Sequence, residues 1–269
     1  MQDLPTLYLE GISLWSPRTP DWQQAKRVIR GECAPHATKS PRPSTTLLPP
    51  TERRRIPDTV AIALEVAARA CEMSQRDPAE LPSVFASTHG DTAISDYMCA
   101  TLAATPNLIS PTKFHNSVHN AAAGYWTIAV RSFAPYTALS AYENTFASGL
   151  LEAAMQAVCE RSPVLFVAYD IEAVGPLATI LNCSGSLGIG MVISTDAPRS
   201  GARSMRLRMR GAPADARVQP TPACTPAAEL VAGNTLAAAF PFVERLAMDA
   251  PGSVTLALGA RCALEIEIS

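Results

Sequence analysis

Two of the four histidines in this 269-residue chain have a spacing that could hold a metal ion. His115 and His119 are four residues apart, so on a helix they would share one face, as the zinc-binding histidines of the H-E-x-x-H motif do. The glutamate of that motif is absent, because Asn116 follows His115. We therefore expect no metal and no other cofactor, and we expect both side chains to pack and to form hydrogen bonds.

Seven cysteines are the other residues that could do chemistry. They are widely spaced and contain no C-x-x-C pair, which indicates neither a zinc site nor a disulfide framework and fits a reducing cytoplasm. Cys183 precedes Ser184 and Gly185, as a nucleophilic cysteine can, but this segment leads into an apolar strand-like run and not into a helix. Without a helix dipole to stabilise a thiolate, we expect Cys183 to be inert.

A stripe of three arginines alternates with apolar residues in the last third of the chain, which predicts a strand with one basic face. The arginines are Arg206, Arg208 and Arg210. This face is either merely solvated or contacts an acidic partner, and the pattern leaves both interpretations open. The net charge of −2 implies no general affinity for polyanions, so we do not expect a nucleic acid partner.

The elements that must position these residues alternate between strands and apolar helices. The predicted strands are residues 6–14, 83–87, 136–139, 163–169, 188–194, 205–210 and a pair within 253–269, in which Leu264, Ile266 and Ile268 point inward. The predicted helices are residues 58–74 with Asp58 as the candidate N-cap, 116–130, 144–160, and a helix within 227–249 that Gly233 and Pro241 interrupt. A proline-rich loop is predicted at residues 211–226. This alternation predicts an α/β fold with a buried mixed sheet covered by alanine-rich helices.

The composition is that of a globular protein, with 48% hydrophobic and 17% charged residues. The first residues, M-Q-D-L-P, lack the basic end and apolar stretch of a signal peptide. The uncharged run 173–195 is long enough to cross a membrane, but it contains Pro176, Asn182 and four glycines. Two buried strands and a turn explain this run better. We therefore expect a cytoplasmic protein without stable membrane insertion.

The block from Ser83 to Ala153 is the most informative part of the sequence. Residues 110–129 read S-P-T-K-F-H-N-S-V-H-N-A-A-A-G-Y-W-T-I-A and precede a proline, a short strand and a helix. This order resembles the segment of β-ketoacyl synthases that leads to their catalytic cysteine, which has Ser-Pro, Asn, Ala-Gly, a helix, Gly-Pro, a strand and Thr-Ala-Cys. The positions that keep this pattern are Asn120, Ala123, Gly124, Thr127, Ile128 and Pro135.

No cysteine stands where that family has its nucleophile. An alignment without a gap puts S-A-Y-E (140–143) on the family's small-Thr-Ala-Cys, so Glu143 takes the place of the cysteine. A three-residue slip puts Phe146 there instead. We favour Glu143, because the ungapped alignment needs no insertion. Ser140 and Glu143 also fit a capping box at the start of helix 144–160, so Glu143 either caps the helix, mimics an acyl group or assists decarboxylation.

The remaining catalytic groups of the family are missing as well. Ketosynthases carry two further histidines, or a histidine and an asparagine, in a second thiolase half-domain, whereas no histidine follows His119 here. The resemblance implies a thiolase-type ketosynthase N-terminal domain over residues 1–198, with residues 199–269 as a shortened C-terminal segment packed on it. This truncated layout looks like the short ketosynthase-like proteins, or chain length factors, of bacterial aryl-polyene and xanthomonadin-type pigment pathways.

By this resemblance the chain has no activity of its own and forms a heterodimer with a full-length β-ketoacyl synthase. It would shape the acyl tunnel while its partner elongates a polyene or polyketide on an acyl carrier protein, by the condensation also used in fatty acid biosynthesis. The expected tunnel and interface residues are Thr88, His89, Asp91, Phe114, His115, Asn116, His119, Asn120, Tyr125 and Trp126. Two alternatives stay open: a malonyl-carrier-protein decarboxylase or priming enzyme that uses Glu143, and a solitary scaffold protein.

Overall fold

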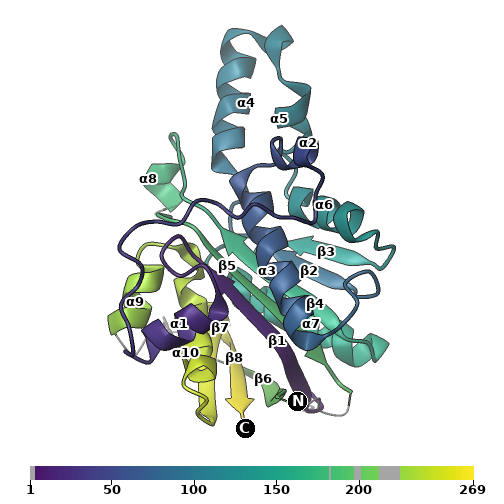
Figure 1. Cartoon of the computed structure of the whole chain (residues 1–269), viewed down its shortest axis with the longest axis vertical. Coiled ribbons are helices and arrows are strands. Elements are labelled where there is room, and N and C mark those ends of the chain that lie inside the picture. Colours follow the sequence, from purple (N-terminus) through teal and green to yellow (C-terminus); the bar gives the residue numbers. More distant parts are fainter. Residues whose placement is uncertain (1–3, 182, 197–200, 212–224) are drawn as a thin grey trace.

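One mixed sheet of eight strands organises the chain in the order β3-β2-β4-β5-β1-β6-β8-β7 (Figure 1). The computed structural model describes residues 4–181, 183–196, 201–211 and 225–269. The strands are β1 (Leu7–Trp15), β2 (Ser83–Ala86), β3 (Tyr136–Leu139), β4 (Val164–Asp170), β5 (Leu187–Ser194), β6 (Arg203–Gly211), β7 (Gly252–Gly259) and β8 (Cys262–Ile268). The strands β3, β2 and β4 are parallel, and each further neighbour along the sheet is antiparallel.

Helices cover both faces of this sheet. One hydrophobic cluster joins α1, α7 and α10 to the sheet, and a second joins α3 and α6 to the opposite face. The α-helices are α1 (Trp22–Ile29), α2 (Pro50–Arg53), α3 (Asp58–Ser74), α4 (Thr92–Ala104), α5 (Pro111–His115), α6 (Ala121–Val130), α7 (Thr145–Glu160), α8 (Ala178–Leu181), α9 (Thr225–Val231) and α10 (Phe240–Ala247). Three 3-10 helices are η1 (Pro106–Leu108), η2 (Tyr142–Asn144) and η3 (Thr235–Ala239). In Figure 1, α4 and α5 project beyond the sheet at the top.

The central strands β4 and β5 are buried along their whole length, which confirms the expectation from their continuous apolar runs. In β4, Val164, Phe166 and Ala168 belong to the cluster with α7. The alternate residues Leu165 and Val167 belong to the cluster with α3. The two-residue period of a strand therefore divides its side chains between two cores, and the α/β fold with a covered mixed sheet is the observed one.

The helix α3 crosses β1 and β5 so closely that both strands need glycine at the contact. A Cβ atom on Gly190 would lie 2.3 Å from the carbonyl oxygen of Val66, and one on Gly11 would lie 2.3 Å from that of Ala70. Side chains cannot approach backbone atoms so closely, so any larger residue must push the helix off the sheet.

We expect Gly190→Ala to lower the free energy of unfolding by about 2–3 kcal/mol, because the new methyl group overpacks a rigid backbone contact. Gly124→Ala is the matched control. Gly124 lies inside α6, and a methyl group added there would meet open space out to 4 Å, so the same substitution should raise stability by about 0.5–1 kcal/mol through helix propensity. Urea unfolding midpoints measure both changes, and similar effects at the two sites would contradict this account.

The structure corrects the predicted helix 116–130, whose first five residues are not helical. A short helix, α5, ends at His115, residues 116–120 form turns, and α6 begins only at Ala121. The physical reason is local, because the polar residues Asn116, Ser117 and Asn120 favour turns over helix interiors. The helix α4 was not predicted at all, although Asp91 caps it by accepting a hydrogen bond from the Ile94 amide at 3.0 Å.

The limits of α3 are as predicted, but its N-cap is one residue earlier than expected. Its N-cap is Pro57, and Asp58 is the first helical residue, with its carboxylate paired to Arg42 at 3.0 Å. An acidic side chain in the first turn still interacts favourably with the helix dipole. The sequence therefore correctly indicated a helix start at Asp58, but it placed the N-cap one residue too late.

The C-terminal segment extends the same sheet. The strand β6 pairs with β1, and β8 and β7 follow at the edge, with Leu264, Ile266 and Ile268 buried as expected. Of the two predicted interruptions, Gly233 lies between α9 and η3, whereas Pro241 lies in the first turn of α10, which directly follows η3. Most of the predicted loop 211–226 lies outside the described residues, and the proposed boundary between residues 198 and 199 stays a prediction.

None of the helices in the described parts of the chain is long and apolar enough to cross a membrane.

Candidate functional site

A cavity of about 310 Å³ lies where β3 leads into α7, at the position that the sequence assigns to the lost nucleophile. Its walls come from the turn after β2, from η2 and the start of α7, and from α8, η3 and β7. The cavity lining includes Thr88, Tyr142, Glu143, Phe146 and Thr235.

The rim of this cavity includes a sharp turn at Tyr142. Its φ angle of 52° lies in the left-handed region, which costs a non-glycine residue about 1–3 kcal/mol. Tyr142 begins η2, and α7 follows directly from Thr145. The turn therefore sets Glu143 at the N-terminal end of a buried helix, with its side chain exposed.

The predicted capping box between Ser140 and Glu143 is wrong. The Ser140 hydroxyl donates to the carbonyl oxygen of Thr88 at 2.8 Å, and the N-cap of α7 is Asn144, whose side chain makes no capping bond. Because η2 intervenes, Ser140 is four residues before the N-cap and cannot reach the helix start. Thr145 stabilises the turn instead, by accepting from the Ala141 amide at 3.0 Å and donating to the Tyr142 carbonyl at 2.6 Å.

The two candidates for the nucleophile position differ in their surroundings. Phe146 is buried in the core, with its ring centroid 5.3 Å from that of Phe166 and 6.4 Å from that of Phe242. Glu143 is exposed at the cavity and makes no hydrogen bond or ion pair with the described residues. The choice of Glu143 over Phe146 remains a prediction, but only Glu143 presents a polar group at the rim.

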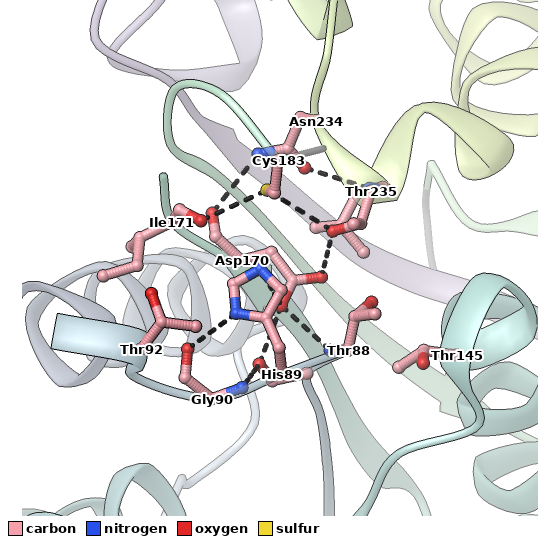
Figure 2. A network of polar contacts seen from close by, with 12 residues as sticks. Thr88, His89, Gly90, Thr92, Thr145, Asp170, Ile171, Cys183, Asn234 and Thr235 are labelled. Atoms are coloured by element: carbon pink, nitrogen blue, oxygen red, sulfur yellow. Dashed lines mark hydrogen bonds and ion pairs between the residues drawn. The ribbon is translucent and has the colours of Figure 1, made fainter. Parts of the chain in front are cut away.

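A buried carboxylate that sequence reasoning missed accepts hydrogen bonds from two residues of the cavity wall, Thr88 and Thr235 (Figure 2). Asp170, at the end of β4, is fully buried. Its Oδ1 atom accepts from the Ser87 hydroxyl at 2.7 Å and from the Thr88 amide at 2.9 Å, and its Oδ2 atom accepts from the Thr235 hydroxyl at 2.6 Å. The available signal was a carboxylate at the end of an apolar strand, because a buried charge requires partners.

Contacts within this chain fix the turn after β2. The His89 side chain is only 4% exposed, its Nδ1 atom lies 3.1 Å from the Gly90 carbonyl, and its Nε2 atom lies 4.0 Å from Asp170. The His119 ring nitrogen contacts the Ser87 carbonyl at 2.9 Å, and Asp91 caps α4. The structure thus brings Thr88, His89, Asp91 and His119 together, as a fixed turn and not as a row of free surface groups.

The other predicted interface residues divide into two groups. Phe114 and His115 are exposed on α5, and Asn120 is half-buried before α6. Asn116, Tyr125 and Trp126 are buried, and Trp126 has no exposed surface at all. Burial also raises the pKa of Tyr125. These three side chains are covered within the chain, and their assignment to the tunnel or the interface stays a prediction.

No metal centre forms from the paired histidines. His115 ends α5 and His119 precedes α6, so the helical spacing that could bind zinc is not realised. Within the described part of the chain, no group of three or more His, Cys, Asp or Glu side chains could hold a metal ion. Cys183 is buried, and desolvation raises the pKa of its thiol, which disfavours the nucleophilic thiolate.

The arginine stripe faces glutamates of the neighbouring strand. Arg210 binds Glu265 at 2.9 Å, Arg208 lies 3.9 Å from Glu267, and Arg206 donates to Thr6. Two of the three charges are therefore balanced within the sheet, which favours a solvated strand face over a carrier-protein contact.

Comparisons with known proteins agree with this geometry. No curated protein matches the chain. Among solved structures, one similar chain comes from the structure of the ketosynthase ApeO in complex with its chain length factor ApeC, from Xenorhabdus doucetiae. It is 20% identical to this chain, with a TM-score of 0.71 over 97% of this chain and 99% of that chain. The ishigamide ketosynthase/chain length factor is 14% identical, with a TM-score of 0.69 over 98% and 99%.

A third similar structure is AntDE:AntF, a type II polyketide synthase acyl-carrier protein in complex with its ketosynthase bound to the hexaketide. It is 13% identical, with a TM-score of 0.75 over 99% of both chains. At these identities the likeness establishes a thiolase-like ketosynthase fold. The family model of the β-ketoacyl synthase N-terminal domain matches residues 21–237, so the chain belongs to the β-ketoacyl synthase family.

Proposed function

We propose that this chain is a chain length factor, a non-catalytic ketosynthase-like subunit that pairs with a full-length β-ketoacyl synthase. In this role it shapes the acyl tunnel while the partner elongates a polyene or polyketide on an acyl carrier protein in the cytoplasm. The solved ketosynthase complexes with chain length factors and a carrier protein support the kind of partner, because they share this fold.

The chemistry of the cavity supports a silent subunit. Among the described residues, the lining has neither cysteine nor histidine, and Glu143 cannot hold an acyl chain as a thioester. The two buried cysteines of the described residues lie elsewhere and are poor nucleophiles, because burial raises the pKa of the Cys71 thiol to about 12 and also raises that of Cys183. An enzyme of this family needs a thiolate at the helix start, where the helix dipole stabilises it.

The open edge of the sheet carries the proposal. In the described part of the chain, β3 hydrogen-bonds only to β2, so its other edge is unpaired. Exposed apolar side chains lie on β3, on α6 and just after it, and on the segment 108–118 that precedes α6, a distribution that marks an interface. They are Leu108, Phe114, Val118, Ile128, Phe133 and Tyr136.

A full-length ketosynthase is the occupant that we propose for this surface. It has the same fold and therefore an edge strand of its own, and two such edges can pair across an interface while the flanking helices pack. The turn Thr88–Asp91 and the segment Phe114–His119 would then border the acyl chain. Since His89 is buried beside Asp170, the exposed Phe114 is the better residue with which to test the tunnel.

We expect Phe114→Ala to lengthen the products by at least one malonyl-derived unit without dissociating the complex, because Phe114 is 62% exposed and available to close the tunnel. Leu102→Ala is the control, since Leu102 is an exposed apolar residue of α4 outside the proposed tunnel segments. Mass spectrometry of carrier-bound products, with size-exclusion analysis of the complex, measures both effects. An unchanged product distribution from an intact Phe114→Ala complex would remove this residue from the tunnel.

A further inference from the structure

Two walls of the cavity beside Glu143 are attached to one carboxylate. Thr88 and Thr235 both line the cavity, and both donate to Asp170, at 2.9 Å through the Thr88 amide and at 2.6 Å through the Thr235 hydroxyl. We propose that Asp170 is a positioning residue, which joins the C-terminal segment to the turn Thr88–Asp91 and so fixes both the cavity and that turn. The consequence for product length rests on the proposed function, whereas the positioning itself does not.

The carboxylate is well placed for this task. It is fully buried and receives donors from two separate parts of the chain, the end of β2 and the start of η3 (Figure 2). A buried acceptor that loses its donor is costly. The contact therefore couples the two segments more firmly than hydrogen bonds between surface groups could.

The turn is tied to the nucleophile position on its other side. The Thr88 carbonyl accepts from the Ser140 hydroxyl at 2.8 Å, three residues before Glu143, while the Thr88 amide points to Asp170. A displacement of Asp170 is thus transmitted through Thr88 to the segment that carries Glu143.

Hydrogen bonds of Asn234 also fix the start of η3, on the C-terminal side of the contact. Asn234 donates through Nδ2 to the carbonyl oxygens of Asp170, at 3.4 Å, and of Gly185, at 3.3 Å. It also caps η3 by accepting from the Leu236 amide at 2.9 Å. The hydroxyl of Thr235 is therefore held toward Asp170 by the backbone of its own helix start.

The contact is sensitive to the loss of a donor. If the Thr235 hydroxyl is removed, the buried Oδ2 atom lacks its donor, whereas Oδ1 keeps the Ser87 hydroxyl and the Thr88 amide. The carboxylate is then no longer attached to η3, and any reorientation of it moves the turn Thr88–Asp91, because the Thr88 amide donates to it.

Hydrogen–deuterium exchange of the isolated chain tests the positioning. In Thr235→Val we expect exchange in the peptide that contains Thr88 to rise at least about tenfold, with little change in β7 and β8. Thr235→Ser keeps the hydroxyl and should exchange like the wild type. Asp170→Asn is a second variant, since the amide can still accept from Thr88 and can donate to Thr235. Wild-type exchange near Thr88 in Thr235→Val, or a uniform rise over the whole chain, would overturn the proposal.

A second arm uses the complex with the ketosynthase. Thr235→Val should change the product length while the complex stays intact, and Thr235→Ser should restore the wild-type distribution. If the exchange result holds but no ketosynthase binds the wild-type chain, the proposed function fails and the positioning role stands. If the complex forms and local exchange rises without a change in product length, the proposed link between Asp170 and the tunnel is wrong.

Discussion

Ile128→Asp should weaken the complex with the ketosynthase at least about 100-fold and leave the free chain folded. Ile128 is 71% exposed on α6, beside the open edge of β3, so the new carboxylate is solvated in the free chain. In the proposed complex the same position is covered, and burial of an unpaired charge costs about 3 kcal/mol or more, which corresponds to roughly 100-fold in affinity. Dissociation constants of the purified proteins measure the effect.

Met248→Asp is the matched control for this substitution. Met248 is 51% exposed at the C-cap of α10, and Ile128 lies in the last turn of α6, so an aspartate meets the same small dipole penalty at both sites. The control should bind the ketosynthase like the wild type. Equal binding by both variants would show that the β3 edge and α6 are not the interface.

The wild-type chain provides a further check on the same surface. Expressed alone, it should self-associate through its exposed apolar residues, and co-expression with the ketosynthase should give a stable 1:1 complex. A monomer that behaves well at micromolar concentration and binds no ketosynthase would rule out the proposed pairing.

Product formation should depend on the partner's nucleophilic cysteine and not on Glu143. Replacement of that cysteine by alanine should abolish elongation, at least about 1,000-fold, whereas Glu143→Gln in this chain should leave the output almost unchanged. The side chain of Glu143 is exposed and makes no capping bond, so its replacement by glutamine should also change stability by less than about 0.5 kcal/mol. Single-turnover elongation assays with defined complexes measure the chemistry.

Glu143→Cys is the complementary variant. The start of α7 would favour a thiolate, so acylation of the new cysteine is expected, but the cavity lining contains no histidine to assist decarboxylation and condensation. Elongation by this variant, with the partner's cysteine disabled, would show that the chain is not silent. Loss of a decarboxylation step in Glu143→Gln, within an intact complex, would favour the decarboxylase alternative instead.

The sequence alone determined the elements whose pattern is local. The limits of α3 were predicted as residues 58–74, and the buried strands β4 and β5 within one residue at each end, because side-chain periods of 3.6 and 2 are visible in a single segment. The absence of a cysteine between Cys99 and Cys159 also required no structure. Fold class and family resemblance therefore followed from short stretches of chain.

Sequence patterns misled where a turn interrupts a helix. Ser140 and Glu143 have the spacing of a capping box, and His115 and His119 have the spacing of a helical pair. In the structure η2 and the turns at 116–120 break both patterns. Spacing predicts a shared helix face only if the helix continues, and short polar residues shift that balance toward turns.

Only the tertiary structure decided which polar groups meet at the site. Asp170 binds Ser87, 83 residues earlier, and Thr235, 65 residues later. No periodic signal joins residues so far apart, because their contact depends on the order of strands in the sheet. The burial of Trp126 and the open edge of β3 have the same origin. Local sequence sets each element's apolar face, whereas the arrangement of the elements determines which faces and carboxylates are covered and which remain at the surface.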